Sequence, residues 1–254
     1  MQTIELFLGD CFDYLPQIPS GSVDMILADL PYGTTYCSWD VTLPFEDLWR
    51  EYNRVIKENG AVVLFGTEPF SSALRLSNIK DYRYDIYWQK DRAANFLFGN
   101  RMPLKVIETI SVFYKKQPTY NPQKRENPKG PSKRHLHKNP SRITGHVQEI
   151  MGESWKLPSW KAGQKYEPDK LLPTSLEYCA REQRGKVHPT QKPVALLERL
   201  ILTYTNEGEN VLDNCMGSGS TGVAALNTKR SFIGMEKEEK YYNIARERVD
   251  IVTT

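Results

Sequence analysis

Short apolar runs alternate along the chain with longer stretches in which apolar and polar residues recur at helical spacing. The runs are too short for helices, and several carry apolar residues on both faces, which is typical of strands buried on both sides of a sheet. A sheet of this kind is covered by helices on both faces. The pattern therefore predicts an α/β fold with a mainly parallel sheet, whose strands lie at residues 4–8, 23–27, 61–65, 84–88, 110–114, 210–212 and 231–234.

Three helices are predicted between or after these strands. Residues 45–57 carry apolar side chains at the spacing of one helix face, and Gly60 follows at a position that suits a C-terminal cap. Residues 193–204 begin with Pro193, and proline is favoured at the first helical position. Residues 237–249 predict a helix that closes the chain.

Composition narrows the class of protein. The chain has 254 residues, of which 39% are hydrophobic and 26% charged, as in a soluble globular protein. No apolar run approaches the roughly 18 residues of a membrane span, and the first ten residues lack a secretory signal, so we expect a cytoplasmic protein with no membrane partner. The cysteines are too widely spaced for a C-x-x-C pair, so we expect reduced thiols and no metal site at Cys11, Cys37, Cys179 and Cys215.

The net charge of +3 conceals two regions of opposite sign. Residues 115–186 hold 16 lysines and arginines against 7 aspartates and glutamates, a net of +9, whereas the rest of the chain has a net of −6. This proline-rich segment predicts an irregular basic insertion that contacts nucleic-acid phosphates, with a solvated linker as the alternative. We therefore expect a core formed by residues 1–114 and 187–254, with residues 115–186 inserted between its two parts.

The strand predicted at 23–27 leads into Ala28-Asp29-Leu30-Pro31-Tyr32-Gly33, which combines a carboxylate, a proline turn and an aromatic ring. The carboxylate can accept hydrogen bonds from an amine, the ring can stack on a flat molecule, and Pro31 keeps Leu30 extended. The combination indicates a site for a planar ligand that carries an amino group. The alternative is an ordinary turn with Tyr32 in the core.

A glycine-rich turn follows the strand predicted at 210–212. Glycines at positions 217, 219 and 222 give the spacing G-x-G-x-x-G, which lets a ligand approach the backbone and presents N–H groups at a helix start. Glu236 lies 23 residues after Asp213, where a carboxylate can accept both ribose hydroxyls of an adenosine. The layout suits NAD and S-adenosylmethionine alike, and a tight structural turn is the alternative.

Together these motifs resemble those of the DNA amino-methyltransferases, specifically the permuted group in which the catalytic motif precedes the cofactor loop. The family's D-P-P-Y motif corresponds to Asp29-Leu30-Pro31-Tyr32, and its glycine loop to residues 213–222. Residues 188–193 match its lead-in to the cofactor half, and Gly9-Asp10-Cys11 resembles its adenine-contacting segment. The resemblance implies a Rossmann-like methyltransferase fold, S-adenosylmethionine as cofactor, and a target-recognition role for the basic insertion.

The resemblance also implies two sets of site residues. The catalytic set, which would hold the target base, is Asp29, Leu30, Pro31 and Tyr32. The cofactor-binding set is Asp10, Cys11, Lys192, Asp213, Asn214, Cys215, Met216, Gly217, Ser218, Gly219, Ser220, Thr221 and Glu236. Lys192 would pair with the cofactor carboxylate, and a solvated lysine at a turn is the alternative. Leu30 replaces the family's first proline, and Glu108 lacks the histidine that often precedes it, so a role for Glu108 in closing the base pocket is a hypothesis.

The implied reaction is methyl transfer to the exocyclic amine of adenine in a specific double-stranded DNA sequence, after the base is flipped out of the duplex. Aspartate at the head of the motif favours adenine. Cytosine-N4 methylation, methylation of RNA or of a protein amide, a catalytically inactive DNA-binding relative and an NAD-dependent oxidoreductase are the alternatives. The residues do not fix the target sequence or the oligomeric state, so a homodimer and a cognate restriction endonuclease as partner both stay open.

Overall fold

The computed structural model describes residues 2–33, 40–93, 95–130, 167, 169–182 and 191–253. Cys37, residues 188–190 and much of the segment 115–186 lie outside the described residues. The described residues form two compact units, a larger one before residue 124 and after residue 173, and a smaller one between these positions. The smaller unit contains a short antiparallel pair, β6 (Arg125–Glu126) and β7 (Lys170–Leu171).

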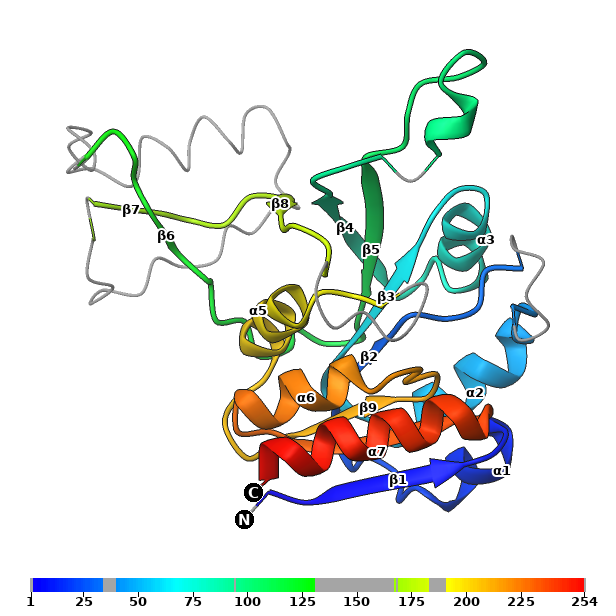
Figure 1. Ribbon diagram of the computed structural model, residues 1–254. Coiled ribbons are helices and arrows are strands. Elements are labelled where there is room, and N and C mark those ends of the chain that lie inside the picture. Colours follow the sequence, from blue (N-terminus) through cyan, green and yellow to red (C-terminus); the bar gives the residue numbers. More distant parts are fainter. Residues whose placement is uncertain are drawn as a thin grey trace. The chain divides into compact units, whose positions relative to one another are not determined.

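An eight-stranded sheet forms the centre of the larger unit (Figure 1). Its order is β1 (Ile4–Leu8), β10 (Ser231–Glu236), β9 (Asn210–Asp213), β2 (Val23–Ala28), β3 (Ile56–Gly66), β5 (Ile107–Phe113), β4 (Tyr82–Gln89) and β8 (Leu176–Tyr178). Neighbouring strands are parallel except that β5 is antiparallel to both β3 and β4. The prediction of a mainly parallel sheet is confirmed.

Helices cover both faces of this sheet, because successive strand residues point to opposite sides. On β2, Ile26 belongs to a core cluster with residues of α1 (Cys11–Tyr14), α2 (Phe45–Val55) and α3 (Phe70–Ser77). Its neighbour Met25 belongs to a second cluster with residues of α5 (Val194–Tyr204), α6 (Ser220–Asn227) and α7 (Glu239–Thr253). The predicted α/β architecture is therefore confirmed. Two short 3₁₀ helices, η1 (Leu15–Gln17) and η2 (Phe96–Phe98), lie in connections.

The prediction that Gly60 caps the helix at 45–57 is wrong. α2 ends at Val55, and β3 begins at the next residue. Gly60 lies inside β3, where an added Cβ would come within 2.7 Å of the Ile56 side chain and 2.8 Å of the Asp24 carbonyl oxygen. Glycine is needed here because two strand backbones approach closely, not because a helix ends.

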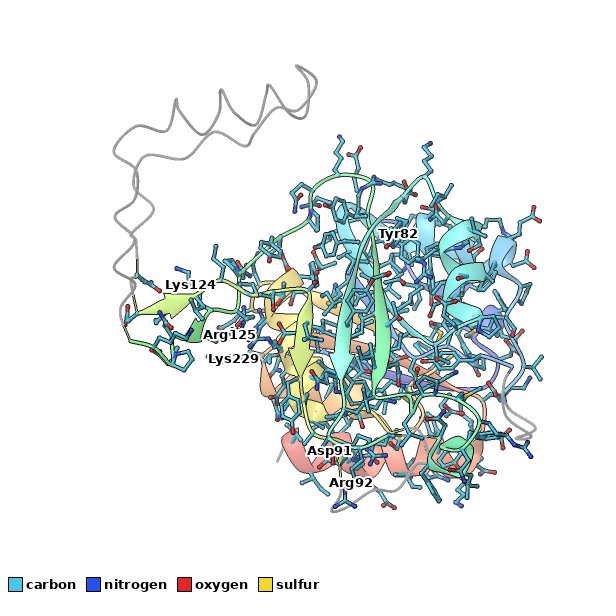
Figure 2. All side chains as sticks on the ribbon, turned by 90° about the horizontal axis from the view of Figure 1, so that it is seen from above. Tyr82, Asp91, Arg92, Lys124, Arg125 and Lys229 are labelled. Carbon is cyan, nitrogen blue, oxygen red and sulfur yellow. The ribbon has the colours of Figure 1, made fainter. Side chains whose placement is uncertain are left out.

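Part of the segment predicted to be irregular joins the sheet. β8 pairs in parallel with β4, with Leu176 opposite Tyr87, and so forms an edge strand. Figure 2 labels Tyr82, the first residue of β4, and Asp91, which lies two residues after the last; the Asp91 end of the strand is at the carboxyl edge of the parallel strands. None of the helices among the described residues has the length and apolar character that crossing a bilayer requires.

Candidate active site

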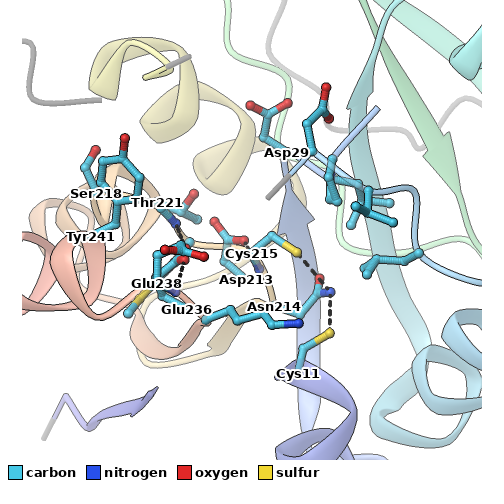
Figure 3. Close-up of a pocket in the computed structure, with 18 of the residues that line it drawn as sticks. Cys11, Asp29, Asp213, Asn214, Cys215, Ser218, Thr221, Glu236, Glu238 and Tyr241 are labelled. Atoms are coloured by element: carbon cyan, nitrogen blue, oxygen red, sulfur yellow. Dashed lines mark hydrogen bonds between the residues drawn. The ribbon is translucent and has the colours of Figure 1, made fainter. Parts of the chain in front are cut away.

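Two motifs that are far apart in the sequence meet at one edge of the sheet. β2 and β9 are adjacent and parallel, with Ile26 opposite Leu212, so Asp29 and the turn after Asp213 leave the sheet at the same edge. Both segments line a single cavity of about 420 Å³. Figure 3 shows Asp29 on one side of it, and Asp213 and Glu236 on the other. In open α/β sheets, ligands bind outside the carboxyl ends of the strands, as at this edge.

Nearly all of the residues assigned from the sequence line this cavity. They are Asp10, Cys11, Asp29, Leu30, Pro31, Tyr32, Lys192, Asp213, Asn214, Cys215, Met216, Gly217, Ser218, Ser220, Thr221 and Glu236. Gly219 does not line it and instead precedes α6 as its N-cap residue. Within the described residues, no group of three or more metal-binding side chains is arranged to hold a metal ion.

The Asp29 carboxylate is held by hydrogen bonds to both of its oxygens. The Tyr32 hydroxyl donates to Oδ1 at 2.5 Å, and the Lys192 ammonium donates to Oδ2. The Tyr32 ring in turn packs against Phe70, with a centroid separation of 4.9 Å. Burial raises the pKa of the Asp29 carboxyl, and the neighbouring ammonium of Lys192 opposes that shift. The turn therefore presents an oriented acceptor to the cavity.

Lys192 belongs to a chain of alternating charges that runs from Asp29 through Lys192 and Glu108 to Lys90, in which Lys192 and Glu108 are buried. Its ammonium lies 3.0 Å from Glu108 Oε1, and Glu108 Oε2 lies 2.5 Å from the ammonium of Lys90. Burial alone would raise the pKa of Glu108, but the two ammonium groups outweigh it and lower that pKa. The family resemblance pairs Lys192 with the cofactor, whereas in the structure its ammonium contacts the carboxylates of Asp29 and Glu108.

The glycine-rich turn is organised around Glu236. The Gly217 N–H donates to Glu236 Oε2 at 2.9 Å, and the Glu238 N–H donates to Oε1 at 2.8 Å. Gly217 has a φ of +52°, a backbone conformation that side-chain-bearing residues rarely adopt. Burial raises the pKa of the Glu236 carboxyl. The Lys237 N–H is a further donor to this carboxylate. An ionised carboxylate has about four acceptor positions, so Glu236 keeps acceptor capacity for hydroxyl groups.

Asp213 is a second carboxylate in an apolar setting. It is 3% exposed, and its Oδ1 accepts a hydrogen bond from the Cys215 N–H at 3.1 Å. Burial raises the pKa of the Asp213 carboxyl to about 7, despite a hydrogen bond with the Thr221 side chain that lowers it. A carboxylate of this kind favours an arriving cation, because the cation would replace the lost hydration.

The sequence pattern did not identify two polar residues, Tyr52 and Lys90, that contact residues of the site. The Tyr52 hydroxyl donates to Asn214 Oδ1 at 2.5 Å, and the Asn214 amide contacts the sulfurs of Cys11 and Cys215. Tyr52 has the spacing of an ordinary core residue on α2, so the pattern carries no signal for this role. The pattern carries no signal for Lys90 either, because its partner Glu108 becomes a neighbour only when β4 pairs with β5.

Comparison with known proteins identifies the family. A family model described as DNA methylase matches residues 23–247. The DNA adenine methyltransferase YhdJ of Escherichia coli K12 is 31% identical to this chain over an alignment 266 residues long. The alignment covers 96% of this chain and 82% of that protein. The Type II methyltransferase M.HinfI of Haemophilus influenzae is 28% identical to this chain over an alignment 273 residues long. The alignment covers 95% of this chain and 67% of that protein.

Among solved structures, the M1.HpyAVI complex with SAM superimposes with a TM-score of 0.63 at 24% identity, covering 97% of this chain and 99% of that chain. This likeness confirms the Rossmann-like fold expected from the sequence. The family model covers most of the chain, including the turn at Asp29 and the glycine-rich turn. The chain therefore belongs to the N6/N4 DNA methylase family.

Proposed function

We propose that this DNA methyltransferase uses S-adenosylmethionine to methylate the exocyclic amine of adenine, in a specific DNA sequence and with the target base flipped out of the duplex. The observation that carries the proposal is the cavity shared by the Asp29 turn and the glycine-rich turn. Holding two reactants together in one place converts a bimolecular step into an effectively unimolecular one and so lowers its barrier. A single cavity with an amine-binding end and a nucleotide-binding end supports such a reaction.

The residues around the glycine-rich turn fit S-adenosylmethionine, the methyl donor that this family uses. Glu236 offers acceptors for ribose hydroxyls, and the buried Asp213 carboxylate offers an acceptor for the ammonium group. Phe12 and Met216 supply apolar surface in the same cavity. When bound, the cofactor supplies an electrophilic methyl group attached to a positively charged sulfur.

The chain's own residues then have two tasks at the other end of the cavity. The adenine amine is a poor nucleophile because its lone pair is delocalised into the ring. Asp29 and the backbone carbonyl of Leu30 would accept its two hydrogens, which turns the lone pair out of the ring plane toward the methyl group. A hydrogen bond to a charged group contributes roughly 1.5–3 kcal/mol.

Tyr32 would hold the face of the same base. Stacking on an aromatic ring contributes roughly 1–3 kcal/mol. Together with the hydrogen bonds to Asp29 and the Leu30 carbonyl, this offsets the few kcal/mol needed to extrude a base from the duplex. The Tyr32 ring is held for this task by Phe70 and by its own hydroxyl.

Two observations support adenine over cytosine as the target. The motif begins with aspartate at position 29. The relative that shares 31% identity over 96% of the chain carries the name DNA adenine methyltransferase. Cytosine-N4 methylation is the competing outcome of the test.

The test is mass spectrometry of nucleosides from unmethylated bacterial DNA treated with the purified protein and S-adenosylmethionine carrying a deuterated methyl group. We expect deuterated N6-methyladenine, and no product from an Asp29→Ala control. Deuterated N4-methylcytosine as the sole product would overturn the base assignment. Absence of any deuterated nucleoside from wild-type protein that binds the cofactor would overturn the proposed activity.

A further inference from the structure

Lys192 is buried and ion-paired, whereas a lysine at an ordinary turn is solvated. It is 8% exposed, and two of its three N–H donors are directed to the carboxylates of Asp29 and Glu108. Its ammonium also lies 5.0 Å from the centre of the Phe65 ring. A buried ammonium is unfavourable unless it is paired, and this one is paired with two carboxylates.

We propose that Lys192 is a positioning residue for methyl transfer: it keeps Asp29 ionised and oriented toward the amine of the target base, while Glu108 and Lys90 hold Lys192 in place. This proposal rests on the proposed function and names the residue that prepares Asp29. It differs from the assignment of Lys192 to the cofactor carboxylate, and the two assignments predict different measurements.

The geometry leaves Asp29 free to act while it is held. An ionised carboxylate has about four acceptor positions, two on each oxygen. Lys192 uses one position on Oδ2, and the Tyr32 hydroxyl uses one on Oδ1. One position on each oxygen is therefore left for an incoming amine hydrogen. The two protein donors fix the carboxylate plane, so the amine meets an acceptor that is already oriented.

The charges around Asp29 explain why it needs a cation. Glu108 on β5 is a negative neighbour that favours the protonated form of Asp29, and the charge of Asp29 in turn raises the pKa of Asp213 on β9. The Tyr32 hydroxyl donates to Asp29, and Lys192 is the ammonium in direct contact with it. Without Lys192, burial and the Glu108 carboxylate would raise the pKa of Asp29 further and favour its protonated form, and a protonated carboxyl accepts amine hydrogens less well.

The central variant is Lys192→Met, compared with Lys192→Arg, which keeps the charge. Single-turnover methyl transfer is measured from pH 5 to 9, with the cofactor dissociation constant measured by calorimetry at each pH. We expect the acid limb of the Lys192→Met rate profile to move up by about 1–3 pH units, because an adjacent opposite charge shifts a carboxyl by that amount. The limb of Lys192→Arg stays near that of the wild type, and the cofactor dissociation constant changes less than about twofold in both.

Glu108→Gln should move the acid limb of the rate profile in the direction opposite to that of Lys192→Met. It removes a negative neighbour of Asp29, so the acid limb is expected to move to lower pH even though the rate at the plateau falls. Lys57→Met is the matched control: Lys57 pairs with Asp24 at 2.6 Å, and neither residue lines the cavity. Its profile is expected to match that of the wild type.

The titration of Asp29 is also measured directly by carbon-13 NMR of the cofactor-free protein, with the signal assigned by its loss in Asp29→Asn. This readout needs no methyl transfer, so failure of the proposed function and failure of this inference are separable. A raised midpoint in Lys192→Met supports the inference. An unchanged midpoint in Lys192→Met overturns it. An acid limb that does not shift in the rate profile of Lys192→Met also overturns it, whether that variant is slower at every pH or binds the cofactor more weakly.

Discussion

At the scale of single residues, burial determines how the charged side chains of the cavity behave. Asp29 and Asp213 could be identified from the sequence because each lies at the carboxyl end of a strand in a recognisable motif. The two partners of Lys192 could not be, since Asp29 follows β2, Glu108 lies on β5, and the turn before α5 reaches both only in the folded sheet. A sequence motif indicates which groups reach a site, whereas ion pairs across the sheet require the folded arrangement.

Asp213 gives a prediction about stability and pH. Its pKa rises from 3.8 to about 7 on burial, so the folded protein holds this proton more tightly than the unfolded chain. The resulting stabilisation is complete below about pH 4 and is lost as the pH rises through 7. The full loss is at most ~4 kcal/mol, since one pKa unit corresponds to about 1.4 kcal/mol.

Asp213→Asn removes the titrating group and keeps its shape. Urea unfolding of the cofactor-free proteins at pH 4.5 and pH 8 measures the difference. We expect the wild type to lose more unfolding free energy than the variant between these two pH values, by up to ~3 kcal/mol, because about 1 kcal/mol of the full loss has already occurred at pH 4.5. An equal loss in both proteins would show that Asp213 does not titrate in this range.

At the scale of elements, the hydrophobic pattern locates seven of the eight strands of the large sheet but not the residues at which neighbouring elements begin. It predicts a helix to residue 57 with a stop at Gly60, yet α2 ends at Val55, because the chain enters β3 at once. β8 was missed because three residues at a sheet edge leave little periodic signal. The glycine-rich turn is recognisable, but only the structure separates glycines near the cavity from those needed for packing.

Gly219 is a glycine that packing requires. Its φ is +76°, and an added Cβ would lie 2.8 Å from the Ala245 Cβ on α7. Gly208 has a similar φ of +83° with nothing within 4 Å, so Gly208→Ala is a matched control that has the backbone strain alone. We expect Gly219→Ala to destabilise the protein by about 2–4 kcal/mol and Gly208→Ala by about 1 kcal/mol.

Denaturant unfolding measures both variants, and Ala245→Gly in the Gly219→Ala background tests the cause. Part of the stability should return, because the clash between the two Cβ atoms is removed while the close approach to the α7 backbone at 2.9 Å persists. Equal effects of Gly219→Ala and Gly208→Ala would mean that α7 does not oppose a side chain at this position.

At the scale of the whole molecule, the arrangement of strands explains how one site forms from distant segments. β2 and β9 are neighbours in the sheet, which brings the Asp29 turn beside the glycine-rich turn. The order of strands could not be derived from the hydrophobic pattern, because that pattern reports burial rather than pairing. The separation of charge between residues 115–186 and the rest is visible in the sequence and gives the remaining prediction.

Arg125 and Lys129 are exposed basic residues of the smaller compact unit. If this unit binds DNA phosphates, replacing both with serine should weaken binding to any duplex sequence. The slope of log affinity against log salt concentration should fall by about 1 for each phosphate that is no longer neutralised. Fluorescence anisotropy at several salt concentrations measures both quantities. Arg50→Ser, on α2 of the larger unit, is the control, and a double variant that behaves like it would contradict the assignment.

The central claim is that Asp29 acts on the target amine, whereas cofactor binding depends on the glycine-rich turn and Glu236. Single-turnover methyl transfer and cofactor affinity, measured together for Asp29→Ala and Glu236→Gln, test it most directly. For Asp29→Ala we predict a rate at least about 100-fold lower with cofactor affinity largely kept, and for Glu236→Gln a clear loss of cofactor affinity. An Asp29→Ala protein that transfers methyl groups at the wild-type rate would contradict the account.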